Sequence, residues 1–494
     1  MKYIKINPAD NVAVALQDLA KGEVVEGVTL QMDIPRGHKI VLQALKAGDN
    51  VIKYGFPIGH VTRDADAGTM VDHSCIKTNL EGLLEYNYNP ALVEIEKAAV
   101  SRTFKGFRRA DGQVGIRNQI WVIPTVGCVN GICEQIVSKF KSVISSEAEK
   151  SSVDAIVCFP HNYGCSQLGD DHENTRKVLA DMVHHPNAGG VLVVSLGCEN
   201  NQLDAFREMV GPVDESRVKM FVCQKVDDEI AYGVERLKEI YAVASKDVRE
   251  EVPVSELRVG LKCGGSDGLS GITANPLLGV FSDWIVAQGG TTVLTEVPEM
   301  FGAETILMNR CQDVATFDKT VHLINDFKEY FMKQGMPVYE NPSPGNKAGG
   351  ISTLEEKSLG CTQKCGKSIV RGVLKYAERL SVKGLNLLSA PGNDLVASTA
   401  LGASGCQIVL FTTGRGTPFG SFVPTMKIST NTPLYEAKPS WIDFNAGVLA
   451  QGEPMEEVAA RFIEFVLAAA SGEPVNNEKH GIREIAIFKQ GVTL

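Results

Sequence analysis

The chain has 494 residues, of which 44% are apolar and 22% charged, so it is long enough for roughly two to four globular domains. Its formal net charge of −10 argues against a nucleic-acid partner, which requires a basic face. No apolar run approaches the roughly 20 residues of a membrane span, and segment 1–8 lacks the apolar core of a signal peptide. We therefore expect a cytoplasmic protein without a membrane partner, whose 12 cysteines are reduced thiols.

The N-terminal part of the chain carries a loose repeat of a short helical turn, a glycine and a strand. Copies lie at residues 16–25, 42–51 and 62–71. The glycine allows the positive φ that a tight turn between these elements needs. The pattern predicts a small, mostly β domain over residues 1–81. Residues 82–105 have no strong periodicity and few large apolar side chains, so they are expected to form a linker.

From about residue 106 onward, apolar runs alternate with segments of helical periodicity. This alternation predicts parallel sheets built from right-handed βαβ units. The fold class expected is therefore α/β, with a middle unit over 106–252 and a C-terminal unit over 253–494. The charged segment 244–254 is interpreted as a surface connection. Helices are expected at residues 132–145, 173–184, 227–241, 276–287, 315–333, 369–376 and 455–470.

Short apolar, β-branched runs end in loops that are rich in Gly, Cys and Asn. The runs occupy residues 120–126, 155–159, 191–196, 257–262, 385–389 and 408–411. Such runs are typical of buried parallel strands. Because open α/β sheets bind ligands at the carboxyl ends of their strands, we expect these loops to form one or two active-site surfaces of an enzyme.

In the middle unit, the candidate residues follow two of these runs. His161 and Cys165 lie four residues apart, and Cys198, Glu199 and Asn200 occupy the next loop. Imidazole, thiolate and carboxylate groups all bind Fe, Zn or Mn. We expect His161, Cys165 and Cys198 to be metal ligands, His161 and Glu199 to serve acid–base chemistry, and Asn200 to bind substrate hydroxyls. The alternative is that these polar side chains only cap the following helices.

In the C-terminal unit, a glycine-rich turn at 263–271 offers backbone N–H groups to a small carboxylate, with Ser266 and Asp267 facing substrate hydroxyls. The turn lacks both the GxGxxG and the P-loop pattern, so NAD and ATP are not expected. Glu296 and Glu299 are candidate metal ligands or acid–base groups. The alternative for these two is a helix N-terminus that favours acidic residues.

Basic residues lie in further loops of the same unit. Segment 341–350 is rich in turn formers and carries Asn346 as a candidate substrate ligand and Lys347 as a candidate carboxylate clamp or base. Lys364 is the second candidate catalytic lysine. Arg415, in a Thr/Gly loop, suits bidentate carboxylate binding.

These motifs occur in fixed order along nearly the whole chain and resemble the altronate/galactarate dehydratase (UxaA) family. Segments 196–202, 357–364 and 486–494 are more similar to the altronate branch than to the galactarate branch. The resemblance rests on residues 36–40, 115–131, 161–172, 196–202, 263–276, 295–304, 341–350 and 412–418.

The resemblance implies a β-clip (SAF-like) fold for residues 1–81, a Rossmann-like fold for the C-terminal unit, and a homodimer joined through the middle unit. It also implies a hydro-lyase that dehydrates D-altronate to 2-dehydro-3-deoxy-D-gluconate in hexuronate catabolism. Fe(II) is the implied cofactor, with Mn(II) as a substitute. An iron–sulfur cluster held by three of the thiols of Cys128, Cys165, Cys198, Cys263 and Cys361 ranks second, because no pair of these cysteines has C-x2-C spacing. Open alternatives are another sugar acid such as galactarate, an epimerase, and a non-enzymatic sugar-acid binding protein.

Overall fold

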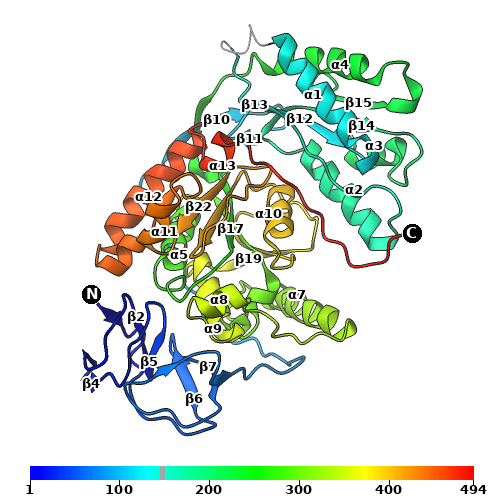
Figure 1. The fold of residues 1–494 in the computed structure, drawn as a ribbon. Helices are drawn as coiled ribbons and strands as arrows, with labels where there is room; N and C mark the ends of the chain where they lie inside the picture. Colours follow the sequence, from blue (N-terminus) through cyan, green and yellow to red (C-terminus); the bar gives the residue numbers. More distant parts are fainter. Residues whose placement is uncertain (145–150) are drawn as a thin grey trace.

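The computed structural model describes residues 1–144 and 151–494 and divides them into three units (Figure 1). The N-terminal unit lies at one end of the molecule, the middle unit at the other, and the C-terminal unit between them. Among the described residues, no helix is both long enough and apolar enough to cross a membrane.

The N-terminal unit is built from short antiparallel strands, as the sequence repeat predicts. A four-stranded sheet has the order β1-β2-β5-β8, and a three-stranded sheet has the order β6-β7-β9. The strands are β1 (Tyr3–Ile4), β2 (Val12–Ala15), β3 (Val24–Val25), β4 (Val28–Thr29), β5 (Lys39–Val41), β6 (Asn50–Lys53), β7 (Phe56–Val61), β8 (Met70–Val71) and β9 (Ile76–Lys77).

The segment that follows has no helix or strand up to residue 102 and lies along the C-terminal unit. The Tyr86 hydroxyl donates to Glu304 over 2.6 Å, and the Tyr88 hydroxyl donates to the Cys311 carbonyl over 2.6 Å. The expected linker is therefore tied down, and it ends earlier than predicted because β10 (Thr103–Arg108) begins before residue 105.

The middle unit is a parallel four-stranded sheet with helices on both faces. Apolar side chains of α1 and α4 pack on one face, and those of α2 and α3 pack on the other. The strand order is β13-β12-β14-β15. The elements are β12 (Gln119–Pro124), α1 (Asn130–Ile144), β13 (Ala155–Cys158), α2 (Gly169–Val183), β14 (Ala188–Ser195), α3 (Leu203–Val210), β15 (Val218–Val222) and α4 (Glu229–Ala244).

A small antiparallel sheet, in the order β11-β10-β16, connects the middle and C-terminal units. It pairs β10 with β11 (Val114–Gly115) and β16 (Glu250–Pro253). The segment 244–254, interpreted from the sequence as a surface connection, therefore contains a strand in its second half. In this strand Glu250 and Glu251 are exposed and Val252 is buried.

The C-terminal unit has a seven-stranded parallel sheet in the order β19-β20-β18-β17-β21-β22-β23. The order reverses between β17 and β21, so the sheet is doubly wound. Its strands are β17 (Arg258–Cys263), β18 (Thr291–Leu294), β19 (Val370–Leu374), β20 (Gly384–Leu388), β21 (Ile408–Thr413), β22 (Thr425–Ser429) and β23 (Phe444–Asn445). The helices are α5 (Ala274–Ala287), α6 (Glu304–Met308), α7 (Val314–Lys333), α8 (Pro344–Ala348), α9 (Leu354–Cys361), α10 (Asp394–Ala403), α11 (Thr432–Ala437), α12 (Met455–Ala470) and α13 (Asn476–Lys479).

One predicted helix of this unit is a strand. Residues 369–376 were expected to be helical, but Val370–Leu374 form β19 and pair with β20. Ile369, Val370 and Val373 are β-branched and fit a sheet better than a helix. The expectation of an α/β chain with parallel sheets is confirmed by both large units.

A buried ion triad fastens the N-terminal unit to the C-terminal unit. The carboxylate of Glu356 on α9 accepts from the Lys39 ammonium over 2.9 Å and from the Lys53 ammonium over 2.7 Å. All three side chains are at most 1% exposed. Burial opposes ionisation of Glu356, but the charges of Lys39 and Lys53 outweigh it and lower the pKa of Glu356 to about 2.

We predict that Glu356→Gln destabilises the protein by about 3–5 kcal/mol, because it leaves two buried ammonium groups without their counter-charge. Urea unfolding at pH 7 measures this. The matched control is Glu464→Gln, which breaks an exposed ion pair with Arg102 and should cost less than about 1 kcal/mol. The folded pKa of Glu356 lies below its ordinary value of 4.5, so its contribution is present above pH 4.5 and lost as the pH falls toward 2. Equal stability of the two variants would contradict the prediction.

Candidate active site

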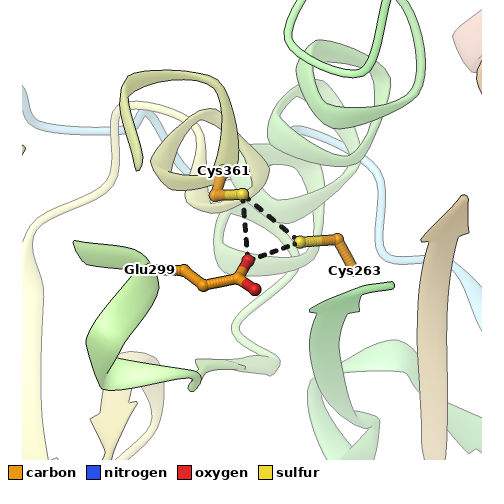
Figure 2. Close-up of side chains that lie close together, drawn as sticks. All are labelled: Cys263, Glu299 and Cys361. Carbon is orange, nitrogen blue, oxygen red and sulfur yellow. Dashed lines mark hydrogen bonds between the residues drawn. The ribbon is translucent and has the colours of Figure 1, made fainter. Parts of the chain in front are cut away.

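Two thiols and a carboxylate meet at the carboxyl end of the C-terminal sheet (Figure 2). Cys263 ends β17, Glu299 lies in the turn after β18, and Cys361 ends α9. The Glu299 Oε2 lies 3.0 Å from the Cys263 Sγ and 3.2 Å from the Cys361 Sγ, and the two sulfurs are 3.3 Å apart. All three side chains are buried. Removing these polar groups from water costs free energy, so their close approach is a specific feature of the fold.

Three lysines surround this group and form ion pairs with Glu299 or with the neighbouring Glu296. The Lys357 ammonium lies 2.7 Å from the Glu299 Oε1. The Lys262 ammonium lies 2.6 Å from the Glu296 Oε1, and the Lys364 ammonium lies 3.3 Å from the Glu296 Oε2. Lys262 also contacts the Asp394 carboxylate over 2.8 Å.

The pKa values of the two glutamates are shifted in opposite directions. Burial alone would raise the pKa of Glu299, but the charges of Lys357, Lys364 and Lys262 lower it to about 2. The pKa of Glu296 is raised, by burial and by the charge of Glu299. Glu299 is therefore held as an anion against the two thiols.

Glu296 adopts a backbone conformation that few non-glycine residues adopt. Its φ is 70° and its ψ is 60°, in the left-handed region. Such a conformation costs about 1–3 kcal/mol and persists only where its surroundings enforce it. Here the carboxylate turns back under β17, where Oε2 accepts the Cys263 backbone N–H over 2.9 Å.

An open cleft of about 620 Å³ leads from the protein surface to this group. Its lining includes Glu299, Asn346, Lys347 and Lys357. The Lys357 ammonium also donates to the Asn346 Oδ1 over 3.3 Å. In the described part of the chain, the Lys347 ammonium has no ion-pair partner. The cleft therefore presents one lysine that is free to bind an anion.

The N-terminal unit reaches the other side of the same group. Tyr54 and Lys53 line a small internal cavity of about 10 Å³ together with Asp267 and Cys361. A cavity of this size holds about one water molecule. Backbones touch where the units meet, since a Cβ on Gly268 would lie 2.1 Å from the Gly37 carbonyl oxygen.

Several residues predicted from the sequence lie around this site. Glu299 is one of the three clustered ligand groups, and Glu296 and Lys364 form a buried ion pair beside it. Asn346 and Lys347 line the cleft. Their positions are those expected of ligand-binding loops at strand ends.

Three other predicted residues differ in their freedom to bind a ligand. The Asp267 carboxylate is already occupied by the Thr430 hydroxyl over 2.9 Å, and burial raises its pKa. The Ser266 hydroxyl is buried and has no hydrogen-bond partner among the described residues, so it is available. Arg415 is exposed on the loop after β21, with its side chain beside Gly265.

The structure does not gather the five predicted metal ligands into one site. His161, Cys165 and Cys198 lie in the middle unit, whereas Glu296 and Glu299 lie in the C-terminal unit. Among the described residues, the group of three His, Cys, Asp or Glu ligand atoms within 4.8 Å of one another is Cys263, Glu299 and Cys361.

The polar residues of the middle unit shape their own loops. The His161 Nε2 bonds the Pro124 carbonyl over 2.8 Å, and its Nδ1 accepts from the Tyr163 backbone N–H over 3.1 Å. Burial lowers the pKa of His161, so its ring is neutral and neither nitrogen is free for a metal or a proton transfer. The Asn200 Oδ1 is likewise engaged, by the Ser166 backbone N–H over 2.8 Å.

Glu199 is a structural anion rather than an accessible base. Its carboxylate accepts from the Thr125 hydroxyl over 2.7 Å, the Ser195 hydroxyl over 2.5 Å and the Gly197 backbone N–H over 2.6 Å. Burial opposes ionisation, but these hydrogen bonds lower the pKa of Glu199.

Sequence reasoning missed Lys262 and Lys357, and it considered Cys263 and Cys361 only as possible ligands of the less favoured iron–sulfur cluster. Lys262 offered a usable signal, because it is a lysine inside an apolar run that was predicted to be a buried strand. Buried lysines are rare unless they are paired. Cys361 lies 98 residues after Cys263, and Lys357 lies 58 residues after Glu299. No local pattern links either pair.

Comparison with known proteins places the chain in a family. Family models match residues 1–79 (altronate/galactarate dehydratase SAF domain), 106–245 (D-galactarate dehydratase/altronate hydrolase, second domain) and 254–493 (D-galactarate/altronate dehydratase, C-terminal). The match to the SAF domain confirms the N-terminal fold that the resemblance implied.

Curated relatives are similar along their full length. The chain is 59% identical over 497 residues to an altronate dehydratase of Bacillus subtilis (strain 168), covering 100% of this chain and 99% of the relative. It is 56% identical to an altronate dehydratase of Escherichia coli (strain K12), covering 100% of both. It is 33% identical to a galactarate dehydratase (L-threo-forming) of Escherichia coli (strain K12), covering 98% of this chain and 96% of the relative. The family models and these full-length matches agree, and the chain belongs to the altronate/galactarate dehydratase family.

Proposed function

We propose that the chain is an altronate dehydratase, a hydro-lyase that converts D-altronate to 2-dehydro-3-deoxy-D-gluconate in hexuronate catabolism. Two full-length relatives above 50% identity carry the name altronate dehydratase, which supports this substrate over galactarate. The observation in the structure that carries the proposal is the cleft, in which Lys347, unpaired within residues 1–144 and 151–494, stands beside a buried group of carboxylates, lysines and thiols.

The reaction removes the proton next to the substrate carboxylate and expels the neighbouring hydroxyl as water. The enediolate that forms needs strong electrostatic stabilisation. Lys347 is placed to bind the substrate carboxylate, because it lines the cleft and its ammonium forms no ion pair with any described residue. Lys357, fixed by Glu299 and Asn346, is placed to stabilise the developing negative charge. The free Ser266 hydroxyl and Arg415 remain candidates for contacts with the rest of the sugar chain.

We propose Fe(II) as the cofactor, with Mn(II) as a substitute, and Cys263, Glu299 and Cys361 as the residues that would hold it. Their donor atoms are 3.0–3.3 Å apart. At this spacing all three donor atoms could bind one divalent ion. A divalent ion there supplies positive charge for the enediolate.

Three coarser features complete the proposal. We propose that the protein is cytoplasmic and forms a homodimer joined through the middle unit. Static light scattering tests the dimer. The C-terminal unit is proposed as a variant of the Rossmann-like fold. Its strand order matches the order of a dinucleotide-binding sheet with β20 inserted between β18 and β19.

For the substrate, we predict that the chain turns over altronate faster than galactarate. The measurement is formation of a 2-keto acid from a panel of aldonates and aldarates, with Fe(II) under reducing conditions. An epimerase or a binding protein would give no 2-keto acid. Faster turnover of galactarate would reverse the assignment.

For the cleft, we predict that Lys347→Met raises the KM for altronate by roughly 10- to 100-fold, because it removes a charge-assisted hydrogen bond worth about 1.5–3 kcal/mol. Initial rates over a range of altronate concentrations measure this. The control is Lys139→Met, an exposed lysine on α1, which should leave KM and kcat unchanged. An unaltered KM in Lys347→Met would remove this residue from the carboxylate site.

For the metal, we predict that a chelator abolishes activity and that Fe(II) restores it better than Mg(II), because two of the three ligands are soft thiols. Cys361→Ser should weaken metal binding, measured as the thiolate-to-cobalt absorption that appears on titration with Co(II). Cys406→Ser, at a buried cysteine outside the group, serves as the control. Full activity of metal-free protein would refute the prediction.

A further inference from the structure

The exposed cysteines of this chain all lie in loops that follow strands of the middle sheet. Cys128, Cys165 and Cys198 are exposed, whereas the other cysteines are buried or half-buried. Cysteine is among the residues most often buried in proteins, so exposed thiols need an explanation. Each of the three directly follows a glycine in the loop after a strand of the middle sheet.

The strands that lead to these cysteines are neighbours. β12 pairs in parallel with β13 on one side and with β14 on the other, so their carboxyl ends lie at one edge of the sheet. The loops that follow are bonded to each other. The Gly127 N–H donates to the Tyr163 carbonyl over 2.9 Å, and the Asn201 N–H donates to the Gly164 carbonyl over 2.9 Å. The Cys165 loop therefore contacts both of the other loops.

Side chains of one loop form hydrogen bonds to the backbone of another. The Asn130 amide donates to the His161 carbonyl over 2.8 Å, and the Asn201 amide donates to the Thr125 carbonyl over 3.1 Å. The ring of His161 and the carboxylate of Glu199 tie their own loops to β12 and its end, as described above. These groups hold the loops in fixed positions, and the thiols are left facing outward.

The glycines allow the loops to approach closely. Gly164 has a φ of 97°, and a Cβ there would lie 2.1 Å from the Thr125 carbonyl oxygen. A Cβ on Gly127 would lie 2.7 Å from the His161 carbonyl oxygen. Rigid loops with buried bracing residues are how proteins hold metal ligands in a set geometry.

The surroundings of the thiols favour negative charge. Each loop leads into the N-terminus of a helix, namely α1, α2 or α3. Helix N-termini stabilise anions through their free N–H groups and dipoles. The Arg176 guanidinium also reaches this region and donates to the Asn201 Oδ1 over 3.2 Å.

The number and spacing of the thiols exclude the simplest metal site. A structural zinc ion takes four protein ligands, and thiolates on one tetrahedral ion with bonds of about 2.3 Å lie about 3.8 Å apart. Cys128, Cys165 and Cys198 do not form a group within 4.8 Å in the described parts of the chain. A polynuclear cluster does not require its thiolates to be this close, because each thiolate binds a different metal ion.

We propose that Cys128, Cys165 and Cys198 bind a four-iron, four-sulfide cluster through three thiolates, leaving one iron without a protein ligand. On binding, each thiol loses its proton and forms one sulfur–iron bond. The fourth iron, having no protein ligand, would be able to accept an oxygen ligand from a small molecule. This site is separate from the Cys263, Glu299 and Cys361 group and does not depend on the proposed function.

The test is reconstitution of the full chain with iron and sulfide under anaerobic conditions. We expect about four irons and four acid-labile sulfides per chain, with a broad absorption near 400 nm that bleaches on reduction by dithionite. Cys128→Ser, Cys165→Ser and Cys198→Ser should each lose sulfide and absorption. Cys361→Ser should keep both, which separates this site from the other iron site.

The matched control is Cys223→Ser. Cys223 follows β15 at the same edge of the same sheet, but it is half-buried and has no preceding glycine. This variant should keep the cluster. Alkylation of the reconstituted wild-type chain provides a readout that needs no variant, since Cys128, Cys165 and Cys198 should be protected until the cluster is removed. Iron without sulfide, absorption retained in the three serine variants, or loss of the cluster in Cys223→Ser would each overturn the proposal.

Discussion

The pairing of buried carboxylates with buried lysines is the constraint on which the rest of the structure depends. An ion taken out of water costs several kcal/mol, and the cost is recovered only if its partner is held in good geometry. Glu296 and Glu299 meet this condition through Lys262, Lys357 and Lys364, which come from β17, α9 and the turn after α9. Because the partners belong to different elements, the strands and helix must assemble in one arrangement before any of these charges is satisfied.

Helix α9 couples this group to the docking of the N-terminal unit. Glu356 pairs with Lys39 and Lys53 of the N-terminal sheets, and the next residue, Lys357, pairs with Glu299. Consecutive residues of a helix point in different directions, so one turn of α9 serves both the interface and the candidate active site. The small cavity lined by Tyr54, Asp267 and Cys361 lies between them. A change in how the N-terminal unit docks would therefore reach the candidate active site through helix α9.

Much of the fold could be predicted from the sequence because its signals are local. Helix α12 begins and ends where its apolar periodicity does. Strands β17 and β14 end where the glycine-rich loops begin. The wrong helix at β19, and the strand β16 that was not predicted, both arose where tertiary pairing decided the structure of a short segment. The candidate site was predictable only in part, since Cys361 approaches Cys263 through the fold and the His161 ring is committed to the Pro124 carbonyl, a partner with no sequence signal.

The central claim is that the chain eliminates water from altronate through an enediolate. The most direct measurement is the reaction of D-altronate in D2O, followed by NMR of the product. We predict 2-dehydro-3-deoxy-D-gluconate with one deuteron at C3, because the enol product must take its new C3 hydrogen from solvent. Deuterium at C2 of recovered sugar acid without any 2-keto acid would show that the chain only exchanges or inverts that centre, and it would contradict the account.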